Sequence, residues 1–387
     1  IIMSQKVFKK TSRDKTIGVY MGQRDFVDRC DSVDPVDGVV WVDQKALQGK
    51  KVIATLSCTF KYGRDDQEVL GINFKRDIFV SNRQVFPPLE DIDRATHTDM
   101  QKKLIKKLGD NAMPFFFEFP DNLPCSVAIQ PGPQDTGKKC AVEFEVRAYC
   151  PDLPDEKAIK KSTVKLAVRK IQYAPEDKQV IPTADSTFEF LLSDKPLQIK
   201  ATLDKGLYYH GDAITVNVDI RNSSSRTIKN IAVAVEQITN VVLYSNDSYV
   251  KTVAIEEFSD TVAAQAKWEK TVTLIPTLAR LEVKKGIAVD GKLRHDDTNL
   301  ASSSIVKADV LNEVLGMMVQ YRVVVKATGS ALMQSSDVQV DLPFKLMNPH
   351  PSLAVAGGED VVIEDFKRVA IKGAGDEDGG DGSDAEG

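Results

Sequence analysis

The sequence contains no long hydrophobic run, few cysteines and none of the short motifs that mark common enzymes. No apolar stretch reaches the ~20 residues that a membrane-spanning helix needs, so we expect a soluble protein. The five cysteines include no CxxC pair, and no secretory signal is visible in the first residues. These absences argue against a disulfide framework and a structural zinc site, so we expect reduced thiols in a cytoplasmic protein.

Catalytic signatures are missing as well. The four histidines lack any metal-ligand spacing, and the sequence shows no GxSxG, no phosphate-binding loop and no GxGxxG after a strand. We therefore expect no enzymatic activity, and no bound metal, cofactor or nucleic acid.

The net charge of −5 is spread unevenly along the chain. Residues 351–387 hold ten acidic and three basic side chains, a net charge of −7, so the rest of the chain carries about +2. A mildly basic body can hold such an acidic tail against itself and release it to an anionic competitor. The distal segment "GAGDEDGGDGSDAEG" has low complexity, and we expect it to be disordered.

Most of the chain alternates apolar and polar residues with a period of two. Ile214, Val216, Val218 and Ile220 show this pattern, and similar segments recur along the sequence. Many short strands between Gly, Pro and Asn turns predict β-sandwiches, and their extent favours two of them. We expect an N-terminal sandwich at 1–175, a hinge at 176–185, a C-terminal sandwich at 186–350 and a regulatory acidic tail at 351–387.

One segment, residues 98–108, is predicted to be an amphipathic helix. Thr98 and Gln101 have the spacing of a capping box, and Gly109 follows the last apolar position. Met100, Leu104 and Leu108 form one apolar stripe. From the residues alone, this helix is expected to cover one face of a sheet.

An acidic loop, "DGKLRHDDTNLASSS" at residues 290–304, gathers Asp290, Asp296 and Asp297. Three interpretations compete: a metal site, an acid/base pair, and an electrostatic seat for cations from distant parts of the chain. The spacing does not match an EF-hand loop, and nothing nearby resembles a nucleophile. Buried carboxylates need cationic partners, preferably arginines. Arg169 and Arg368 are candidates, although composition does not select them over other arginines.

A series of stretches then resembles the arrestins, from Val7 to about Lys372. They are "RDFVDRCDSVDPVDGVV", "YGRDDQEVLG", "LIKKLGDNAMPF", "LPCSVAIQPGPQDTGK", "DKGLYYHG" and "IAVDGKLRHDDTNLASS", in this order. Within that family, "EQITNVVLYS" and "EDVVIEDFKR" are most similar to the visual arrestin of cone photoreceptors, the X type. The clathrin-binding motifs expected of non-visual members are absent or degraded.

The resemblance implies an all-β fold of two immunoglobulin-like arrestin sandwiches, one short amphipathic helix and an acidic tail docked on the first sandwich. It also implies a protein that binds light-activated, phosphorylated opsin, a G-protein-coupled receptor, and terminates its signalling in photoreceptor outer and inner segments. The alternative is a non-visual arrestin that couples receptors to endocytosis and scaffolding. A trafficking scaffold of the retromer type shares the sandwich pair but should lack the charged residues below.

Three groups of residues match the switch elements of the family. Its polar core corresponds to Asp25, Arg169, Asp290, Asp297 and Arg368, which a receptor phosphate would disrupt by attracting Arg169. Its three-element contact corresponds to Val7, Phe8, Leu104, Ile105, Leu108, Val361, Ile363 and Phe366. Its phosphate-sensing bases correspond to Lys9, Lys10, Lys106, Lys107 and Arg294, a patch that inositol phosphates could also occupy.

Residues 62–74 match the loop that enters the active receptor. The match covers Gly63, Arg64, Asp65, Asp66, Val69, Leu70 and Gly71, whose glycines would supply hinge freedom. Peripheral membrane contact is implied in the receptor-bound state. One departure concerns the tail, because rod-type relatives have Phe where this chain has Val361 and Ile363. Smaller side chains bury less apolar area, so we hypothesise a more loosely docked tail and easier activation.

Overall fold

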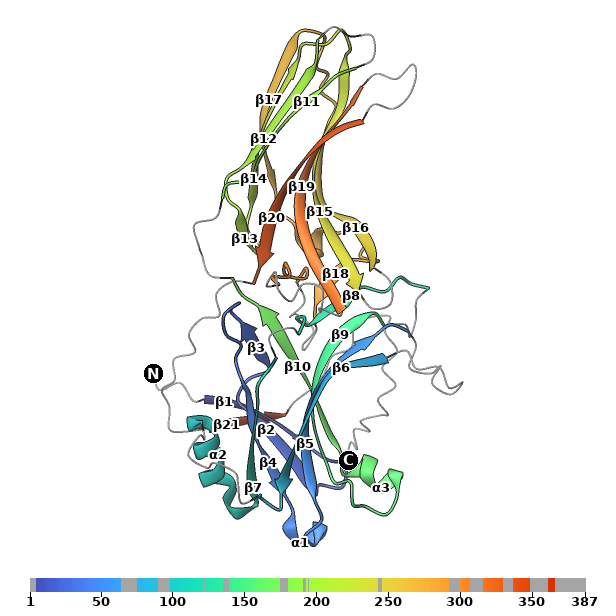
Figure 1. The fold of residues 1–387 in the computed structure, drawn as a ribbon. Coiled ribbons are helices and arrows are strands. Elements are labelled where there is room, and N and C mark those ends of the chain that lie inside the picture. The colour runs from blue at the N-terminus through green and yellow to red at the C-terminus, as the bar shows by residue number, and fades with distance from the viewer. Residues whose placement is uncertain are drawn as a thin grey trace, which may run out of the picture.

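The computed structural model describes residues 5–63, 75–89, 98–120, 123–134, 139–174, 180–190, 193, 195–242, 246–291, 299–306, 316–329, 337–348 and 361–365. Over these residues the protein is two β-sandwiches that lie end to end (Figure 1). The first sandwich lies at the bottom of the view and is mostly blue and cyan, and the second lies at the top and is mostly green to red. The predicted all-β fold of two sandwiches is confirmed.

The first sandwich consists of a five-stranded and a seven-stranded sheet. The five-stranded sheet has the order β21 (Val361–Asp365), β1 (Gln5–Thr11), β2 (Ile17–Met21), β4 (Val36–Val42) and β7 (Ala112–Phe117). The other runs β18 (Ala288–Asp290), β8 (Val127–Ile129), β9 (Ala141–Tyr149), β10 (Val164–Gln172) and β3 (Asp25–Asp28), with β5 (Val52–Lys61) on β9 and β6 (Lys75–Phe86) on β5.

The second sandwich consists of a four-stranded and a five-stranded sheet. The four-stranded sheet has the order β11 (Thr183–Phe188), β12 (Leu197–Leu203), β14 (Ile214–Asn222) and β17 (Ala266–Leu274). The five-stranded sheet has the order β13 (Leu207–Tyr209), β20 (Asp337–Met347), β19 (Gly316–Gly329), β15 (Ile228–Val242) and β16 (Asn246–Phe258). The predicted alternation is visible in β14, where Ile214, Val216, Val218 and Ile220 are all buried.

The predicted helix is α2 (Asp99–Leu108), which packs on a face of the five-stranded sheet, against β4 and β7 and over Val7 of β1 (Figure 1). Thr98 caps it: its Oγ1 accepts a hydrogen bond from the Gln101 amide at 3.3 Å, and Gln101 Oε1 accepts one from the Thr98 amide at 3.0 Å. The helix ends at Gly109, whose φ of 72° suits a residue without a β-carbon. Both ends of the helix therefore agree with the sequence prediction.

The expectation of a single helix needs correction. Two further short helices are present, α1 (Gln44–Leu47) and α3 (Glu156–Lys161), together with the 3-10 turns η3 (Gly109–Asn111) and η4 (Leu278–Arg280). α1 and α3 are only four and six residues long, too short for an apolar stripe to repeat. Among the described residues, no helix is long and apolar enough to cross a membrane.

Two segments return to the first sandwich from later in the chain. β18 follows β17 of the second sandwich, yet it pairs antiparallel with β8, with Asp290 opposite Val127. β21 pairs in parallel with β1, with Ile363 opposite Val7. These two pairings bring the sequence-predicted switch residues together. Of the expected hinge, residues 176–179 lie outside the described residues, and residues 183–185 lie in β11.

Candidate functional site

Arg169 and Asp25 form the centre of the candidate site. Strand β10 runs parallel to β3, and its register places Arg169 opposite Asp25. The guanidinium donates two hydrogen bonds to the Asp25 carboxylate, from Nε and from Nη2, each at 2.6 Å. This fork geometry is the strongest arrangement available to an arginine and a carboxylate. The arginine side chain is 12% exposed and the aspartate 37%, so the pair is open to solvent through its acidic member.

The third described contact of the guanidinium comes from the segment that follows β18. Arg169 Nη1 donates to the Gly291 carbonyl oxygen at 2.9 Å. The contact is close-packed, because a β-carbon added to Gly291 would lie 3.1 Å from Ser126 Cβ and 3.6 Å from Arg169 Cγ. Arg169 therefore ties β3 of the first sandwich to a segment that belongs, in chain order, to the second.

Asp290, next to Gly291, is a buried carboxylate surrounded by polar groups. Its Oδ1 accepts a hydrogen bond from the Ser302 amide at 3.2 Å, and Asn348 also donates to it. Burial raises the pKa of Asp290 to about 7, although the Ser302 amide and the charge of Arg169 act in the opposite direction. At a pH near 7, the charged and neutral forms of Asp290 are therefore both populated.

His210 completes this buried group. Its Nε2 lies 3.9 Å from Asp290 Oδ2 and 3.0 Å from Ser302 Oγ, and Ser302 Oγ also accepts from Asn348 Nδ2 at 2.9 Å. Burial lowers the pKa of His210 to about 4, so its imidazole is neutral at physiological pH. The histidine and Asp290 therefore do not form an ion pair there.

The structure thus brings Asp25, Arg169 and Asp290 to one junction between the sandwiches. The other predicted members of this group, Asp297 and Arg368, lie outside the described residues, as does the predicted phosphate-sensing Arg294. Their roles stay predictions.

Of the two β1 residues predicted to contact α2, only Val7 faces the helix. Val7 is fully buried with Met100 and Leu104 in a small cluster, against which Ile105 and Leu108 pack. Phe8 lies on the opposite side of the strand, where it packs against the main core and under the guanidinium of Arg24, 5.5 Å from the ring centroid. Successive residues of a strand point to opposite faces, so β1 does not offer both side chains to the helix.

The tail contributes a backbone pairing to this contact. β21 extends the sheet beside β1, with Val361 opposite Gln5 and Ile363 opposite Val7. Phe366 lies outside the described residues. The edge of β1 that would otherwise be open is therefore covered by the tail.

The four described lysines of the predicted phosphate sensor lie around this pairing. Lys9 and Lys10 are on β1, opposite Tyr20 and Val19, and the Lys9 ammonium lies 5.8 Å from the centre of the Tyr20 ring. Lys106 and Lys107 are exposed in the last turn of α2. Cations in that turn are favoured by the helix dipole, so a stable positive patch is expected here.

The predicted receptor loop is described only at its start. Gly63 follows β5, and its carbonyl oxygen accepts a hydrogen bond from the Lys139 amide at 2.9 Å. Arg64, Asp65, Asp66, Val69, Leu70 and Gly71 lie outside the described residues.

Sequence reasoning missed several polar residues near Arg169. His210, Ser302 and Asn348 come from three distant segments, and no local pattern connects them. Lys170 did carry a signal, because the period-two pattern that buries Leu166 and Val168 in β10 also places Lys170 on the buried face. A lysine in phase with core positions indicates a buried charge with a partner.

The described residues contain no cluster of three or more His, Cys, Asp or Glu side chains that could hold a metal ion. What the arrangement can do chemically is exchange one anion for another. The guanidinium already binds a carboxylate in a bidentate manner, and phosphate oxygens fit the same fork.

Comparisons with known proteins identify relatives over nearly the whole chain. The family model described as "Arrestin (or S-antigen), N-terminal domain" matches residues 17–174, and that of the C-terminal domain matches residues 193–351. S-arrestin of Xenopus laevis is 48% identical, over 95% of this chain and 94% of that relative. Arrestin-C of Xenopus laevis is also 48% identical, over 97% of this chain and 98% of that relative. S-arrestin of Mus musculus is 46% identical, over 96% of this chain and 94% of that relative.

Proposed function

The chain belongs to the arrestin family, and we propose that it binds light-activated, phosphorylated opsin and thereby blocks G-protein coupling. Arrestins are adaptors, so the chain is not an enzyme. The observation that carries the proposal is the Arg169 guanidinium, bound by the Asp25 carboxylate and the Gly291 carbonyl at the junction of the two sandwiches.

A receptor phosphate would act as a competitor for Arg169. It carries a charge of about −1.5 to −2 and three strong acceptor oxygens, against the single charge of Asp25. Once Arg169 turns to the phosphate, Asp25 and Gly291 lose their shared partner. β18 then stays linked to this sheet by its three-residue pairing with β8 and by the backbone hydrogen bonds of Gln130 with Ile287 and Gly286 beside it. The sandwiches could then move relative to each other.

The lysines beside the tail would give phosphates their first contact. Lys9 and Lys10 are on the strand that β21 pairs with, and Lys106 and Lys107 lie on the adjacent helix. An anionic receptor segment attracted to these lysines would arrive at the edge of β1 and compete with β21 for it. Loss of the tail, with its net negative charge, would expose more of the positive body.

Activation is then a population shift with two requirements. Phosphates favour the state without the Arg169–Asp25 pair, and the active receptor favours the state whose loops fit its cavity. We propose residues 62–74 as the inserted loop. Because each ligand contributes only its own differential affinity, neither alone should populate the bound state fully.

Co-sedimentation with opsin membranes tests the proposal. The membranes are prepared dark or light-activated, and with or without phosphorylation, and binding of the native chain is compared with Arg169→Glu. The native chain should need both light and phosphate, whereas Arg169→Glu should bind light-activated membranes without phosphate. Equal binding of the native chain to all four membranes would contradict the proposal.

Arg322 offers a matched control for the charge reversal. It binds Glu236 Oε2 from Nε at 2.9 Å and from Nη2 at 2.7 Å, and it binds Asp341 at 2.8 Å, all within the second sandwich. Arg322→Glu therefore breaks an ion pair of similar geometry far from Asp25. It should leave the requirement for phosphate unchanged. If Arg322→Glu relaxed this requirement as much as Arg169→Glu does, the cause would be general destabilisation.

We further propose that the protein is of the cone type and works in the cytoplasm of photoreceptor cells. The stretch "EQITNVVLYS" supports the cone type, whereas the S and C relatives are equally similar to the chain at 48% identity. A tail that leaves β1 no faster than that of a rod-type arrestin would contradict the proposed loose docking.

Inositol phosphates are proposed as competitors at the lysine patch, and the membrane as a peripheral contact of the receptor-bound state. Tight clathrin binding would favour the non-visual alternative instead.

A further inference from the structure

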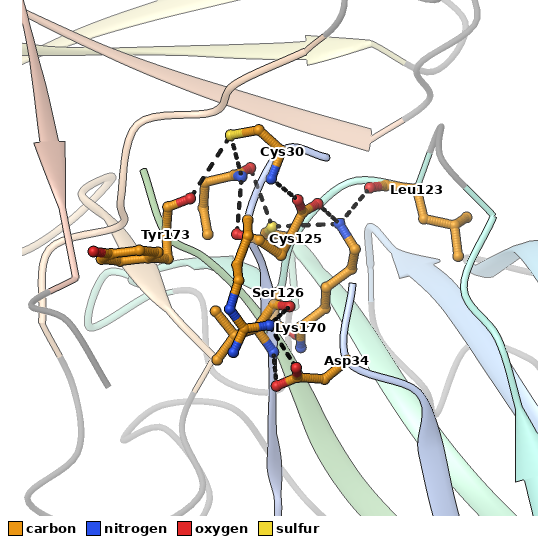
Figure 2. Close-up of polar contacts among 11 residues, drawn as sticks. Cys30, Asp34, Leu123, Cys125, Ser126, Lys170 and Tyr173 are labelled. Carbon is orange, nitrogen blue, oxygen red and sulfur yellow. Dashed lines mark hydrogen bonds and ion pairs between the residues drawn. The ribbon is translucent and has the colours of Figure 1, made fainter. Parts of the chain in front are cut away.

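Lys170, the residue after Arg169, is a lysine in the core of the first sandwich. Its side chain is 1% exposed, and it occupies the buried face of β10 together with Leu166 and Val168. Figure 2 shows its ammonium group among Leu123, Cys125 and the neighbouring carboxylate. Nζ forms an ion pair with Asp28, donates to the Leu123 carbonyl oxygen at 3.1 Å, and lies 3.7 Å from Cys125 Sγ.

These partners keep the lysine charged in spite of its burial. Burial alone would lower the pKa of Lys170, but the neighbouring Cys125 and Asp28 outweigh it and raise that pKa. A buried ion pair is seldom required for stability, because a well-packed apolar pair of similar volume often serves as well. Stability alone therefore does not explain why a charged lysine occupies this buried position.

Lys170 holds two segments that both lead to Arg169. On one side it binds Asp28, which ends β3, three residues after Asp25. On the other side it binds the segment before β8 through Leu123 and Cys125. The backbones of Lys170 and Ser126 are also joined: the Ser126 amide donates to the Lys170 carbonyl at 2.9 Å, and Ser126 Oγ accepts from the Lys170 amide at 3.0 Å.

The segment held by Lys170 in turn positions the acidic side of the junction. Ser126 immediately precedes β8, whose Val127 lies opposite Asp290. Ser126 also lies against Gly291, the residue whose carbonyl accepts from Arg169. A single ammonium group thus ties β3, which carries Asp25, to the segment that supports Asp290 and Gly291.

We propose that Lys170 is the positioning residue of the phosphate trigger. It fixes the two acceptors of Arg169 on either side of the guanidinium, so that the arginine leaves them only when a phosphate competes for it. Without Lys170, β3 and the segment before β8 could shift apart, and Arg169 would lose its partners without any phosphate. The inference rests on the function proposed above, and it assigns to Lys170 no contact with the phosphate itself.

Two variants separate positioning from stability. Lys170→Met keeps the length of the side chain and removes its charge, but it leaves the Asp28 carboxylate without its cation. The double variant Lys170→Met/Asp28→Asn removes both charges. The carboxamide that replaces the Asp28 carboxylate keeps an oxygen acceptor for the Cys30 amide, which in the native chain donates to Asp28 Oδ1 at 2.8 Å. The double variant should therefore regain most of the stability that the single variant loses.

The phosphate requirement should respond differently. We expect both variants to bind light-activated, unphosphorylated opsin membranes about tenfold better, relative to phosphorylated ones, than the native chain does. That is the change in an equilibrium that one charge-assisted hydrogen bond can supply. Arg322→Met serves as the matched control, because it removes a partly buried arginine from an ion pair of the second sandwich. It should not change the ratio.

Amide hydrogen exchange gives a second readout without any receptor. In both Lys170 variants, the amides of β3, β8 and β18 should exchange faster, while those of β19 and β20 keep their native rates.

The inference is overturned if the double variant keeps the native ratio and exchange rates, or if Arg322→Met relaxes the ratio equally. A native chain that ignores phosphate would overturn the proposed function and, with it, the inference. A native chain that selects phosphate, together with Lys170 variants that select it equally well, would overturn the inference alone.

Discussion

The imidazole of His210 and the carboxylate of Asp290 lie 3.9 Å apart, buried together where the second sandwich meets the first. Burial raises the pKa of Asp290 to about 7 and lowers the pKa of His210 to about 4. The two residues come from segments 80 positions apart in sequence. Because the two pKa values shift in opposite directions, a substitution of either residue should change how the stability of the protein depends on pH.

The first prediction concerns the pH dependence of stability. A carboxyl whose pKa rises on folding stabilises the fold below its unfolded pKa, and this contribution is lost as pH rises through 4 to 7. A histidine whose pKa falls on folding stabilises the fold above about 6.5, and this contribution is lost as pH falls to 4. In the native protein the two effects oppose each other between pH 4 and 6.5.

Single substitutions should expose each effect. Asp290→Asn leaves His210, so the free energy of unfolding should rise between pH 4 and 6.5, by on the order of 3 kcal/mol. His210→Gln leaves Asp290, so the free energy of unfolding of that variant should fall as pH rises over the same range. Denaturant titrations at several pH values measure both slopes, with Arg169 and Asp25 unchanged as the nearby charges. Slopes equal to that of the native protein would contradict the prediction.

The second prediction concerns the cap of α2. Thr98 Oγ1 accepts from the Gln101 amide and also donates to Asp37 Oδ2 at 2.6 Å, and burial raises the pKa of Asp37. Thr98→Ala removes the cap and leaves the half-buried Asp37 without its donor, so it should cost about 2 kcal/mol of unfolding free energy. Thr98→Ser keeps the hydroxyl and should cost little, which thermal unfolding can compare directly.

The third prediction concerns the packing of α2 on β1. Leu104 is fully buried against Val7 and Met100, whereas Ile105 is only partly buried. Leu104→Ala should lower the free energy of unfolding by roughly 3 kcal/mol, because it removes buried methyl groups and leaves a cavity. Ile105→Ala should cost much less. Equal losses would mean that the helix packs through a different face.

The fourth prediction concerns three glycines of the first sandwich. A β-carbon at Gly291 would lie 3.1 Å from Ser126 Cβ, one at Gly38 would lie 2.6 Å from the Phe115 ring, and one at Gly18 would meet nothing closer than 3.4 Å. Alanine should therefore be severe at Gly38, cost about 1 kcal/mol at Gly291, and be nearly neutral at Gly18.

Binding assays extend this series of glycine variants. Only Gly291→Ala should also relax the phosphate requirement, because it displaces the carbonyl that Arg169 binds. An unchanged requirement in that variant would show that Arg169 does not depend on Gly291.

The sequence predicted those parts of the fold that depend on residues close together in the chain. The alternation of β14 and the cap of α2 needed only neighbours in sequence, and both were recognised. The helices α1 and α3 were missed, because four and six residues cannot display a helical period.

The site was less accessible to sequence reasoning. The acidic loop indicated that cations were needed, but only the family resemblance selected Arg169, because the β3–β10 register joins residues 144 positions apart. His210 gave no local signal at all. Lys170 gave one, since its phase in β10 marked it as buried.

The pairing of β18 with β8 also has a consequence for the order in which the protein is made. A ribosome completes β8 about 160 residues before it reaches β18, so this edge of the seven-stranded sheet waits unpaired through the synthesis of most of the second sandwich. Open strand edges invite pairing with other chains. The nascent protein should therefore be most prone to aggregation in that interval, and a chain ending before residue 288 should remain so permanently.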